Sequence, residues 1–358
     1  MKIGILTFPH APSLGAMLQM GALYHTVESL GHDVEIINYV NDAVNHKRKA
    51  VLTPKSVIIR ILSTLFLKSS KPSFREFESE MKMFPQEPTC SPEMLQEIAA
   101  RYDRIIVGSD QVWNPVVTGG DLNFYLAFCG ENKKKASYAA SFGYSRKEDI
   151  GAAKAADLLN DFAYLGVREK QGQQLIKEMT GRNASVVLDP TLLTSREYLL
   201  SQMQESNIKN KYVLFFCVKP SPWLLQRAKA YAKENGLELV TIGGRLKDRF
   251  NPAKHPQFGV GPKEFLGLVC DAECVFTNSF HGMAISIAMQ RNFYVEYSSD
   301  TNSRLINLVD MFGLQDRVVD NQALLPTDID YNAVESILEK QREFSLSFLK
   351  EILAEEQT

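Results

Sequence analysis

Several polar segments of the sequence follow apolar runs, and their side chains could bind an anion and transfer a proton. One of them, GSDQVWNP at residues 108–115, carries the candidate side chains Ser109, Asp110, Gln111, Trp113 and Asn114. An aromatic ring beside amide groups is typical of sugar-binding sites, because the ring face stacks on C–H groups. Turn formation alone would explain Gly108, Ser109 and Asp110. The types of Gln111, Trp113 and Asn114 favour a binding role.

A second polar segment, TNSFHG at residues 277–282, follows another apolar run. Asn278 or Ser279 would cap the helix that comes next, and the free amides of its first turn would form a phosphate site. His281 lies in that turn and is a candidate general base, because a helix N-terminus disfavours protonated imidazole. A lone histidine is usually structural, but the cap, Gly282 and the strand end favour a functional role.

Two further segments also follow predicted strands. Arg168 ends an apolar run and begins a helix, so its planar guanidinium is suited to bind a carboxylate or phosphate. The alternative is that Arg168 only pairs with Glu169 or another acidic side chain. The loop at residues 9–15, which contains His10, is either an ordinary connection or a ligand contact, and we weigh these two interpretations equally.

The elements that would position these residues alternate between apolar runs and amphipathic stretches, which is typical of a parallel α/β sheet. For the first half we predict strands at 2–8, 34–39, 104–107, 136–140, 163–167 and 185–188, with helices at 16–30 and 169–179. For the second half we predict strands at 212–218, 238–242, 274–277 and 293–297, with helices at 222–235, 263–270, 280–289, 302–312 and 331–355. The carboxyl ends of such strands are where ligands bind.

This order predicts an α/β fold with two Rossmann-like domains facing a cleft, joined by a hinge at residues 189–210. The N-terminal domain would cover residues 1–190, with a helical insertion at 41–100, and the C-terminal domain residues 191–330. A C-terminal helix at 331–358 would follow.

Composition argues against several classes of partner and site. The 358 residues carry a formal net charge of −2, which argues against a nucleic-acid partner. The five cysteines are an odd number and no signal peptide precedes the first strand, so we expect reduced thiols and a cytoplasmic location. No apolar run is long enough to span a bilayer, and no cysteine or histidine spacing indicates a metal site.

Taken together, the motifs resemble those of the polysaccharide pyruvyl transferase family, in a branch common among bacterial surface-polysaccharide clusters, from about Gly4 to Arg317. The resemblance is carried by GAMLQMGAL at residues 15–23, VGSDQVWNP at 107–115, SYAASFG at 137–143, VREKQG at 167–172, LDPTL at 188–192 and TNSFHG at 277–282. It implies a GT-B-like fold, phosphoenolpyruvate as donor and a cyclic pyruvate ketal on a sugar of a capsule or exopolysaccharide as product. No cofactor or metal is implied.

The sequence departs from the family pattern at two positions. Ser279 occupies a position where relatives often carry an arginine that is thought to hold the donor, and Ser13-Leu14-Gly15 replaces Asn-Tyr-Gly. We assign the donor carboxylate to Arg168, with Arg304 or Arg245 as substitutes, and include Gly15 among the binding residues. The N-terminal domain would be the acceptor side and the C-terminal domain the phosphoenolpyruvate side. His281 would be the general acid or base, and Asp110 would orient the acceptor or share the proton transfer.

Two other functions remain open from the sequence. A GT-B glycosyltransferase using a nucleotide sugar would need a ribose-binding acid, and none is clear in the second half. A non-catalytic sugar-binding relative is supported by the missing arginine. Because family acceptors are often polyprenyl-linked, the basic residues around the apolar run within 55–71 suggest peripheral contact with the inner membrane face; packing against the protein's own core is the stronger alternative.

Overall fold

The computed structural model describes residues 1–11, 13–41, 44, 72–143, 152–243, 256–297, 303–319 and 328–355. These residues form two compact units. The N-terminal unit comprises Met1–Lys49, Glu78–Leu193 and Leu338–Thr358, and the C-terminal unit comprises Ala50–Phe77 and Thr194–Ile337.

Within the described residues, the N-terminal unit contains a seven-stranded parallel sheet in the order β3-β2-β1-β4-β5-β6-β7. The strands are β1 (Lys2–Leu6), β2 (Asp33–Tyr39), β3 (Met83–Thr89), β4 (Arg104–Val107), β5 (Lys135–Ala140), β6 (Tyr164–Val167) and β7 (Ser185–Val186). Strands β4 and β5 are buried along their whole length. Parallel sheets covered on both faces have such continuous apolar runs, which is why the sequence predicted these strands well.

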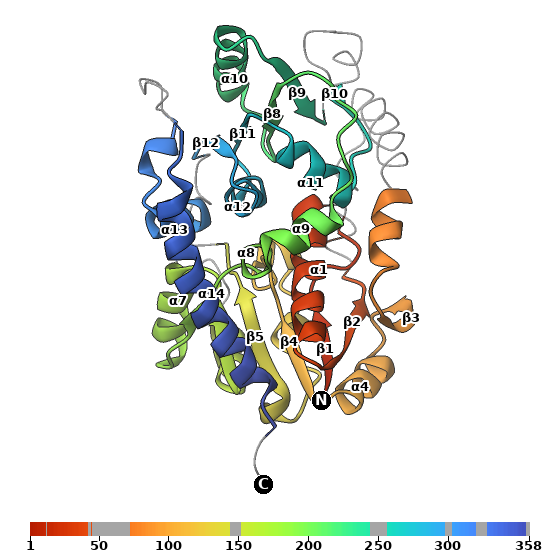
Figure 1. The fold of residues 1–358 in the computed structure, drawn as a ribbon. Coiled ribbons are helices and arrows are strands. Elements are labelled where there is room, and N and C mark those ends of the chain that lie inside the picture. Colours follow the sequence, from red (N-terminus) through yellow and green to blue (C-terminus); the bar gives the residue numbers. More distant parts are fainter. Residues whose placement is uncertain are drawn as a thin grey trace, which may run out of the picture. The chain divides into compact units, whose positions relative to one another are not determined.

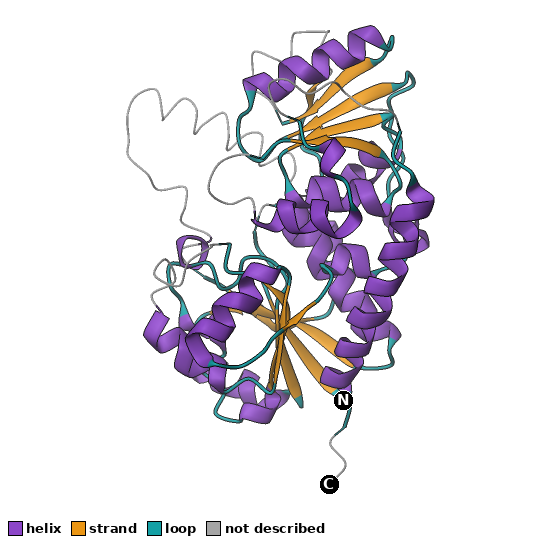
Figure 2. Ribbon diagram, turned by 90° about the vertical axis from the view of Figure 1, so that its left-hand side faces the viewer, coloured by secondary structure: helices purple, strands orange, loops and turns teal. Residues whose placement is uncertain are grey.

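Helices cover both faces of this sheet (Figures 1 and 2). They include α1 (Leu14–Ser29), α4 (Pro92–Arg101), α6 (Ala152–Asn160), α7 (Lys170–Thr180) and the short α5 (Pro115–Thr118) and α8 (Pro190–Leu193). The hydroxyl of Ser13 caps α1 by accepting from the Ala16 amide at 3.4 Å. Helices α1, α5, α7 and α8 each follow a strand of the sheet and begin at its carboxyl edge.

The predicted helical insertion at 41–100 is wrong for residues 83–89, which form the edge strand β3. This strand contains Pro85 and Pro88, which an edge strand tolerates because one of its sides lacks a partner. Residues 72–78 and 92–101 are helical as expected. Residues 42–43 and 45–71 lie outside the described part of the chain, and with them the basic segment predicted to contact a membrane.

The C-terminal unit has its own parallel sheet, with five strands among its described residues in the order β10-β9-β8-β11-β12. Its strands are β8 (Tyr212–Phe216), β9 (Glu238–Ile242), β10 (Pro256–Gln257), β11 (Cys274–Thr277) and β12 (Asn292–Val295). Its helices are α9 (Arg196–Gln202), α10 (Pro222–Glu234), α11 (Pro262–Cys270), α12 (Phe280–Ala288) and α13 (Ser303–Phe312). Helix α12 joins the neighbouring strands β11 and β12 and is entirely buried.

The last helix, α14 (Tyr331–Leu353), is longer than the others described. Its first residues belong to the C-terminal unit, where the Tyr331 hydroxyl donates to the Ser286 carbonyl at 3.3 Å. Its later residues belong to the N-terminal unit, where Arg342 Nε donates to the Leu192 carbonyl oxygen at 2.8 Å. None of the described helices is both long and apolar enough to cross a membrane.

Candidate functional site

The carboxyl ends of β4 and β5 have an unusual backbone. Asp110 and Ala139 adopt left-handed φ values of 73° and 50°, and Gly108 has φ 122°. A Cβ at Gly108 would lie 2.1 Å from the Tyr138 carbonyl oxygen, so only glycine fits there. Left-handed conformations of residues with side chains are costly and cluster at functional sites. The two strand ends therefore form a candidate site on backbone grounds alone.

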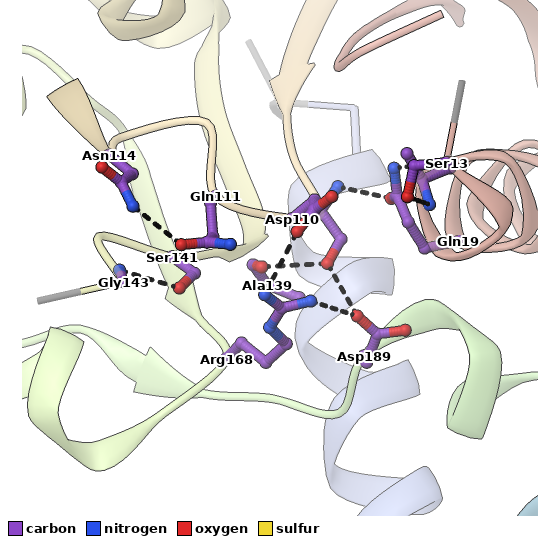
Figure 3. Close-up of polar contacts among 12 residues, drawn as sticks. Ser13, Gln19, Asp110, Gln111, Asn114, Ala139, Ser141, Gly143, Arg168 and Asp189 are labelled. Atoms are coloured by element: carbon purple, nitrogen blue, oxygen red, sulfur yellow. Dashed lines mark hydrogen bonds and ion pairs between the residues drawn. The ribbon is translucent and has the colours of Figure 1, made fainter. Parts of the chain in front are cut away.

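Arg168 joins three carboxylates at this edge of the sheet. Its guanidinium donates to Asp189 Oδ2 at 2.8 Å and to Asp110 Oδ1 at 3.4 Å, and its Nε lies 3.9 Å from Glu169 Oε2. Figure 3 shows the guanidinium between Asp110 and Asp189. Although burial by itself opposes the charge of Arg168, the carboxylates of Asp189, Asp110 and Glu169 raise its pKa above the ordinary value.

This geometry argues against Arg168 as the clamp for a substrate anion. The charge of this buried residue is already compensated by acidic side chains. An incoming carboxylate would join a cluster that has more negative than positive groups, which is electrostatically unfavourable. These contacts favour a positioning role, in which Arg168 holds Asp110, and the assignment of the donor carboxylate to Arg168 stays a prediction.

Asp189 also lies at this edge and was not among the predicted site residues, although the LDPTL motif contains it. It is buried and accepts from the Thr191 amide at 3.1 Å and the Thr191 hydroxyl at 2.7 Å through Oδ1. The buried Ser109 hydroxyl lies 3.0 Å from both Asp189 Oδ2 and the Ala139 carbonyl oxygen. The sequence did contain a signal for this residue, because Asp189 follows a predicted strand and directly precedes a proline.

Gln19 of α1 completes the connections by bonding to Ser109 and Thr7. The Ser109 amide donates to Gln19 Oε1 at 3.0 Å, and Gln19 Nε2 donates to Thr7 Oγ1 at 2.9 Å. The Thr7 hydroxyl in turn donates to the Ser109 carbonyl oxygen at 3.2 Å. The loops that follow β1 and β4 are therefore fixed to each other.

The remaining residues of the GSDQVWNP segment divide into exposed and structural positions. Asp110 and Gln111 are partly exposed, and the Asp110 side chain keeps 15% of its surface accessible. Asn114 is buried, donates to Gln111 Oε1 at 2.7 Å and caps α5 through the Val116 amide. Asp110 and Gln111 can therefore reach a ligand, while Asn114 fixes the loop.

The prediction that Trp113 stacks on a sugar is wrong. The ring has no exposed surface, and its Nε1 donates to the Phe124 carbonyl oxygen at 2.9 Å. It packs in the core against the rings of Tyr125, Phe142 and Phe162. A sequence does not reveal which way a single aromatic ring points, and here it points into the N-terminal unit.

In the C-terminal unit, the strand β11 leads into the capped helix α12 as predicted. The Ser279 hydroxyl accepts from the Gly282 amide at 3.3 Å. A Cβ at Gly282 would lie 2.4 Å from Thr277 Oγ1, so the glycine permits this tight start of the helix. The first-turn amides of an α-helix lack partners within the helix and favour anions. The start of α12 is therefore a candidate anion site.

Asn278 has a structural role at this site. Its Oδ1 accepts from the Val218 amide at 3.0 Å, and its Nδ2 donates to the Lys219 carbonyl oxygen at 2.9 Å. The buried Asn278 thereby fixes the loop after β8, which carries the exposed side chain of Lys219, beside the start of α12. Asn278 is thus a positioning residue for this edge of the sheet.

His281 is buried in the first turn of α12, where its ring contacts Phe280 edge-on with a centroid separation of 5.2 Å. Arg304 lies in the first turn of α13, which follows β12, and α12 packs against α13. Since β11 and β12 are parallel neighbours, both helices begin at the same edge of the sheet. His281, Ser279 and Arg304 are therefore grouped at one edge of the C-terminal unit.

Two further predicted residues remain. Gly15 is buried in the first turn of α1, at the carboxyl edge of the N-terminal sheet. Arg245 lies outside the described residues. Among the residues that the structure describes, no group of three or more histidine, cysteine, aspartate or glutamate side chains could hold a metal ion. The candidate residues thus form two sets, one acidic and partly exposed in the N-terminal unit, and one with an amide-rich helix start in the C-terminal unit.

Comparison with known proteins defines the class to which this fold and these motifs belong. The sequence model of the family described as polysaccharide pyruvyl transferase matches residues 14–300. The chain therefore belongs to the polysaccharide pyruvyl transferase family, which is a family of transferase enzymes. A search of curated protein sequences returns no match.

Solved structures confirm the predicted fold class. The UDP-GlcNAc 2-epimerase of Methanocaldococcus jannaschii, in complex with UDP-GlcNAc and UDP, is similar with a TM-score of 0.54 and 15% identity, covering 99% of both chains. The UDP-GlcNAc 2-epimerase of Neisseria meningitidis, bound to UDP-GlcNAc, has a TM-score of 0.56 and 10% identity, again over 99% of both chains. At such low identity these likenesses establish the fold, which is GT-B with two Rossmann-like domains.

Proposed function

We propose that the chain is a ketal pyruvyl transferase. It transfers the carboxyethylidene group from phosphoenolpyruvate onto two hydroxyls of a sugar in a surface polysaccharide or its lipid-linked precursor. The observation that carries this proposal is the family match over residues 14–300, which includes the capped helix start with His281 and the loop with Asp110. The sugar-nucleotide enzymes of similar fold support the class of acceptor only indirectly, through the shared architecture.

The C-terminal unit would bind the donor. Phosphoenolpyruvate carries up to three negative charges, so its site needs cations and amide donors. The first-turn amides of α12, the side chain of Arg304 at the start of α13 and the exposed Lys219 after β8 all belong to one edge of the sheet. Preorganised donors of this kind stabilise charge that develops on a leaving phosphate. Arg304 replaces Arg168 in our assignment because Arg168 is enclosed by carboxylates.

His281 would supply the proton for the first step. Protonation of the phosphoenolpyruvate methylene carbon makes the adjacent carbon an electrophile, and a sugar hydroxyl forms the first C–O bond there. The C–O bond to phosphate breaks, and the second hydroxyl closes the ketal. General acid or base catalysis by a positioned side chain contributes roughly 10²–10⁴-fold to such steps.

The N-terminal unit would receive the sugar. The partly exposed Asp110 carboxylate is held by Arg168 on one oxygen, which leaves the other able to accept from a hydroxyl. Gln111 lies beside it, also partly exposed. Carboxylates and amides are the usual partners of sugar hydroxyls, since each hydroxyl both donates and accepts. We therefore assign acceptor orientation to Asp110 and Gln111.

The proposal is tested by incubating the full chain with phosphoenolpyruvate and a panel of free and polyprenyl-linked hexosides. We expect phosphate release by ³¹P NMR, together with a product whose mass increases by one carboxyethylidene group. Release of a nucleoside diphosphate from a sugar nucleotide would instead identify a glycosyltransferase. Sugar binding without turnover across the panel would identify a non-catalytic relative.

A further inference from the structure

His10 is a partly exposed imidazole that the proposed mechanism does not yet use. It lies in the loop between β1 and α1, three residues after Thr7. Because the Thr7 hydroxyl bonds to the Ser109 carbonyl, this loop and the loop that carries Asp110 are connected at the ends of neighbouring strands. His10 is therefore at the same sheet edge as the proposed acceptor site.

The His10 ring is fixed by one neighbour, Asn38 of β2. His10 Nε2 lies 2.6 Å from Asn38 Oδ1, and the Asn38 side chain is buried. The Asn38 Nδ2 group donates to two backbone carbonyl oxygens of β3, those of Pro85 and Gln86, each at 3.0 Å. The regular pairing of β2 with β3 is interrupted at this point, so the asparagine occupies the gap in the ladder.

These bonds determine the orientation of the Asn38 amide. Amide nitrogen and oxygen atoms are assigned from their partners, and only the NH₂ group can donate to two carbonyl oxygens. The oxygen of Asn38 must then face His10. Since that oxygen only accepts, the hydrogen between the two residues belongs to His10 Nε2.

The tautomer of neutral His10 follows from this bond. A neutral imidazole has one N–H group and one nitrogen with a free lone pair. With the hydrogen held on Nε2 by Asn38, the lone pair is on Nδ1. A ring nitrogen oriented by a hydrogen bond at its other nitrogen is the usual arrangement of a histidine base. Asn38 acts here as a positioning residue.

The reaction has a requirement that His10 would meet. Two sugar hydroxyls each lose a proton, while one proton goes to the methylene carbon, which becomes the methyl group, and one leaves with the hydrogen phosphate. The charge of the phosphoenolpyruvate trianion is thereby conserved in the ketal carboxylate and the phosphate dianion. His281, having given its proton to the methylene carbon, can take one hydroxyl proton back. A second proton acceptor near the sugar would take the other, which then leaves with the phosphate.

We propose that His10 is a second catalytic residue, whose Nδ1 accepts the proton of a sugar hydroxyl while Asn38 holds Nε2–H. This proposal rests on the proposed ketal pyruvyl transfer. The group on which His10 acts is a hydroxyl of the acceptor sugar, and His10 has no part in binding the donor. Loss of His10 therefore affects turnover and leaves donor binding intact.

The direct test compares His10→Gln and His10→Ala with the wild type in the phosphate-release assay. The glutamine can still donate to Asn38 but has no basic nitrogen, so kcat should fall about 10²–10⁴-fold with little change in the KM for phosphoenolpyruvate. Added imidazole should partly restore kcat in His10→Ala. The matched control is His25→Gln, a partly exposed histidine of α1 in the same unit, which should keep the wild-type kcat.

A second readout does not depend on activity. In ¹⁵N NMR of the wild type, His10 Nδ1 should resonate as an unprotonated ring nitrogen when the ring is neutral, and Asn38→Leu should weaken this preference. If the wild type is active and the His10→Gln variant is equally active, the role of His10 is overturned and the proposed function stands. Protonation of Nδ1 in place of Nε2 would have the same consequence. A wild type that releases no phosphate with any acceptor would instead overturn the proposed function itself.

Discussion

The carboxyl edges of the two sheets differ in how they use charge. In the N-terminal unit, Arg168 is buried among Asp189, Asp110 and Glu169, and the polar groups mostly bond to one another. In the C-terminal unit, the start of α12 combines backbone amides with His281, next to the helix that carries Arg304. The first edge is suited to accepting protons and hydrogen bonds from hydroxyls, and the second to binding an anion. This difference supports our proposal that donor and acceptor are bound by different units.

The largest effect is expected for Asp189→Ala, which would break the network of the N-terminal unit. It removes the closest carboxylate of Arg168 and the partner of Ser109 and Thr191. Arg168 would keep Asp110 and Glu169, so the free energy of unfolding should fall by less than the roughly 3–5 kcal/mol that a fully unpaired buried charge costs. Denaturant unfolding of the full chain measures this loss. An unchanged unfolding midpoint would show that the network does not stabilise the sheet edge.

A comparable effect, but on turnover, is expected for His281→Ala. The variant should lose roughly 10²–10⁴-fold in kcat, because the methylene carbon lacks its proton donor. His281 lies in a buried helix, so circular dichroism should accompany the assay to verify folding. A folded variant with wild-type turnover would remove His281 from the mechanism and weaken the assignment of the donor to this edge.

Substitutions of Arg304 and Arg168 test which of the two sheet edges binds the donor. Arg304→Gln should raise the KM for phosphoenolpyruvate about tenfold or more, since a hydrogen bond to a charged group is worth about 1.5–3 kcal/mol. Arg168→Lys should change that KM little and act mainly on stability and kcat through Asp110. The control Arg227→Gln, in the middle of α10, should leave the KM for phosphoenolpyruvate at the wild-type value. A raised donor KM in Arg168→Lys but not in Arg304→Gln would reverse our assignment.

The smallest effect is expected for Ser279→Ala. Loss of an N-cap hydroxyl costs about 0.5–2 kcal/mol of stability, while the first-turn amides remain able to bind an anion. The melting temperature should therefore fall modestly, and the phosphoenolpyruvate KM should stay near that of the wild type. A large rise in KM would mean that the Ser279 hydroxyl itself contacts the donor.

Much of the fold could be predicted from the sequence because its strands are short apolar runs bounded by polar residues. The strands at 104–107, 238–242 and 274–277 were predicted with the bounds that the structure has. The edge strand β3 was missed because its two prolines are compatible with a strand only where one side is unpaired. That condition depends on the neighbouring strands, which a local pattern does not reveal.

The candidate site could be predicted less completely, because its contacts join residues far apart in sequence and because the sequence does not show which way a side chain points. Arg168 and Asp189 are separated by 21 residues in sequence but bond at adjacent strand ends, so the charge compensation of Arg168 was not visible. The direction of the Trp113 ring was equally hidden. Asn38 did leave a signal, since it is a polar residue inside the apolar run IINY of the predicted strand, and such a residue needs a hydrogen-bond partner when buried.

The central claim is that phosphoenolpyruvate binds at the start of α12 and not at the end of β4. Amide hydrogen–deuterium exchange of the full chain, with and without phosphoenolpyruvate, tests it most directly. We predict slower exchange in a peptide that covers residues 277–283 and unchanged exchange in one that covers residues 105–114. Protection of 105–114 with no change at 277–283 would contradict the assignment of the donor to the C-terminal unit.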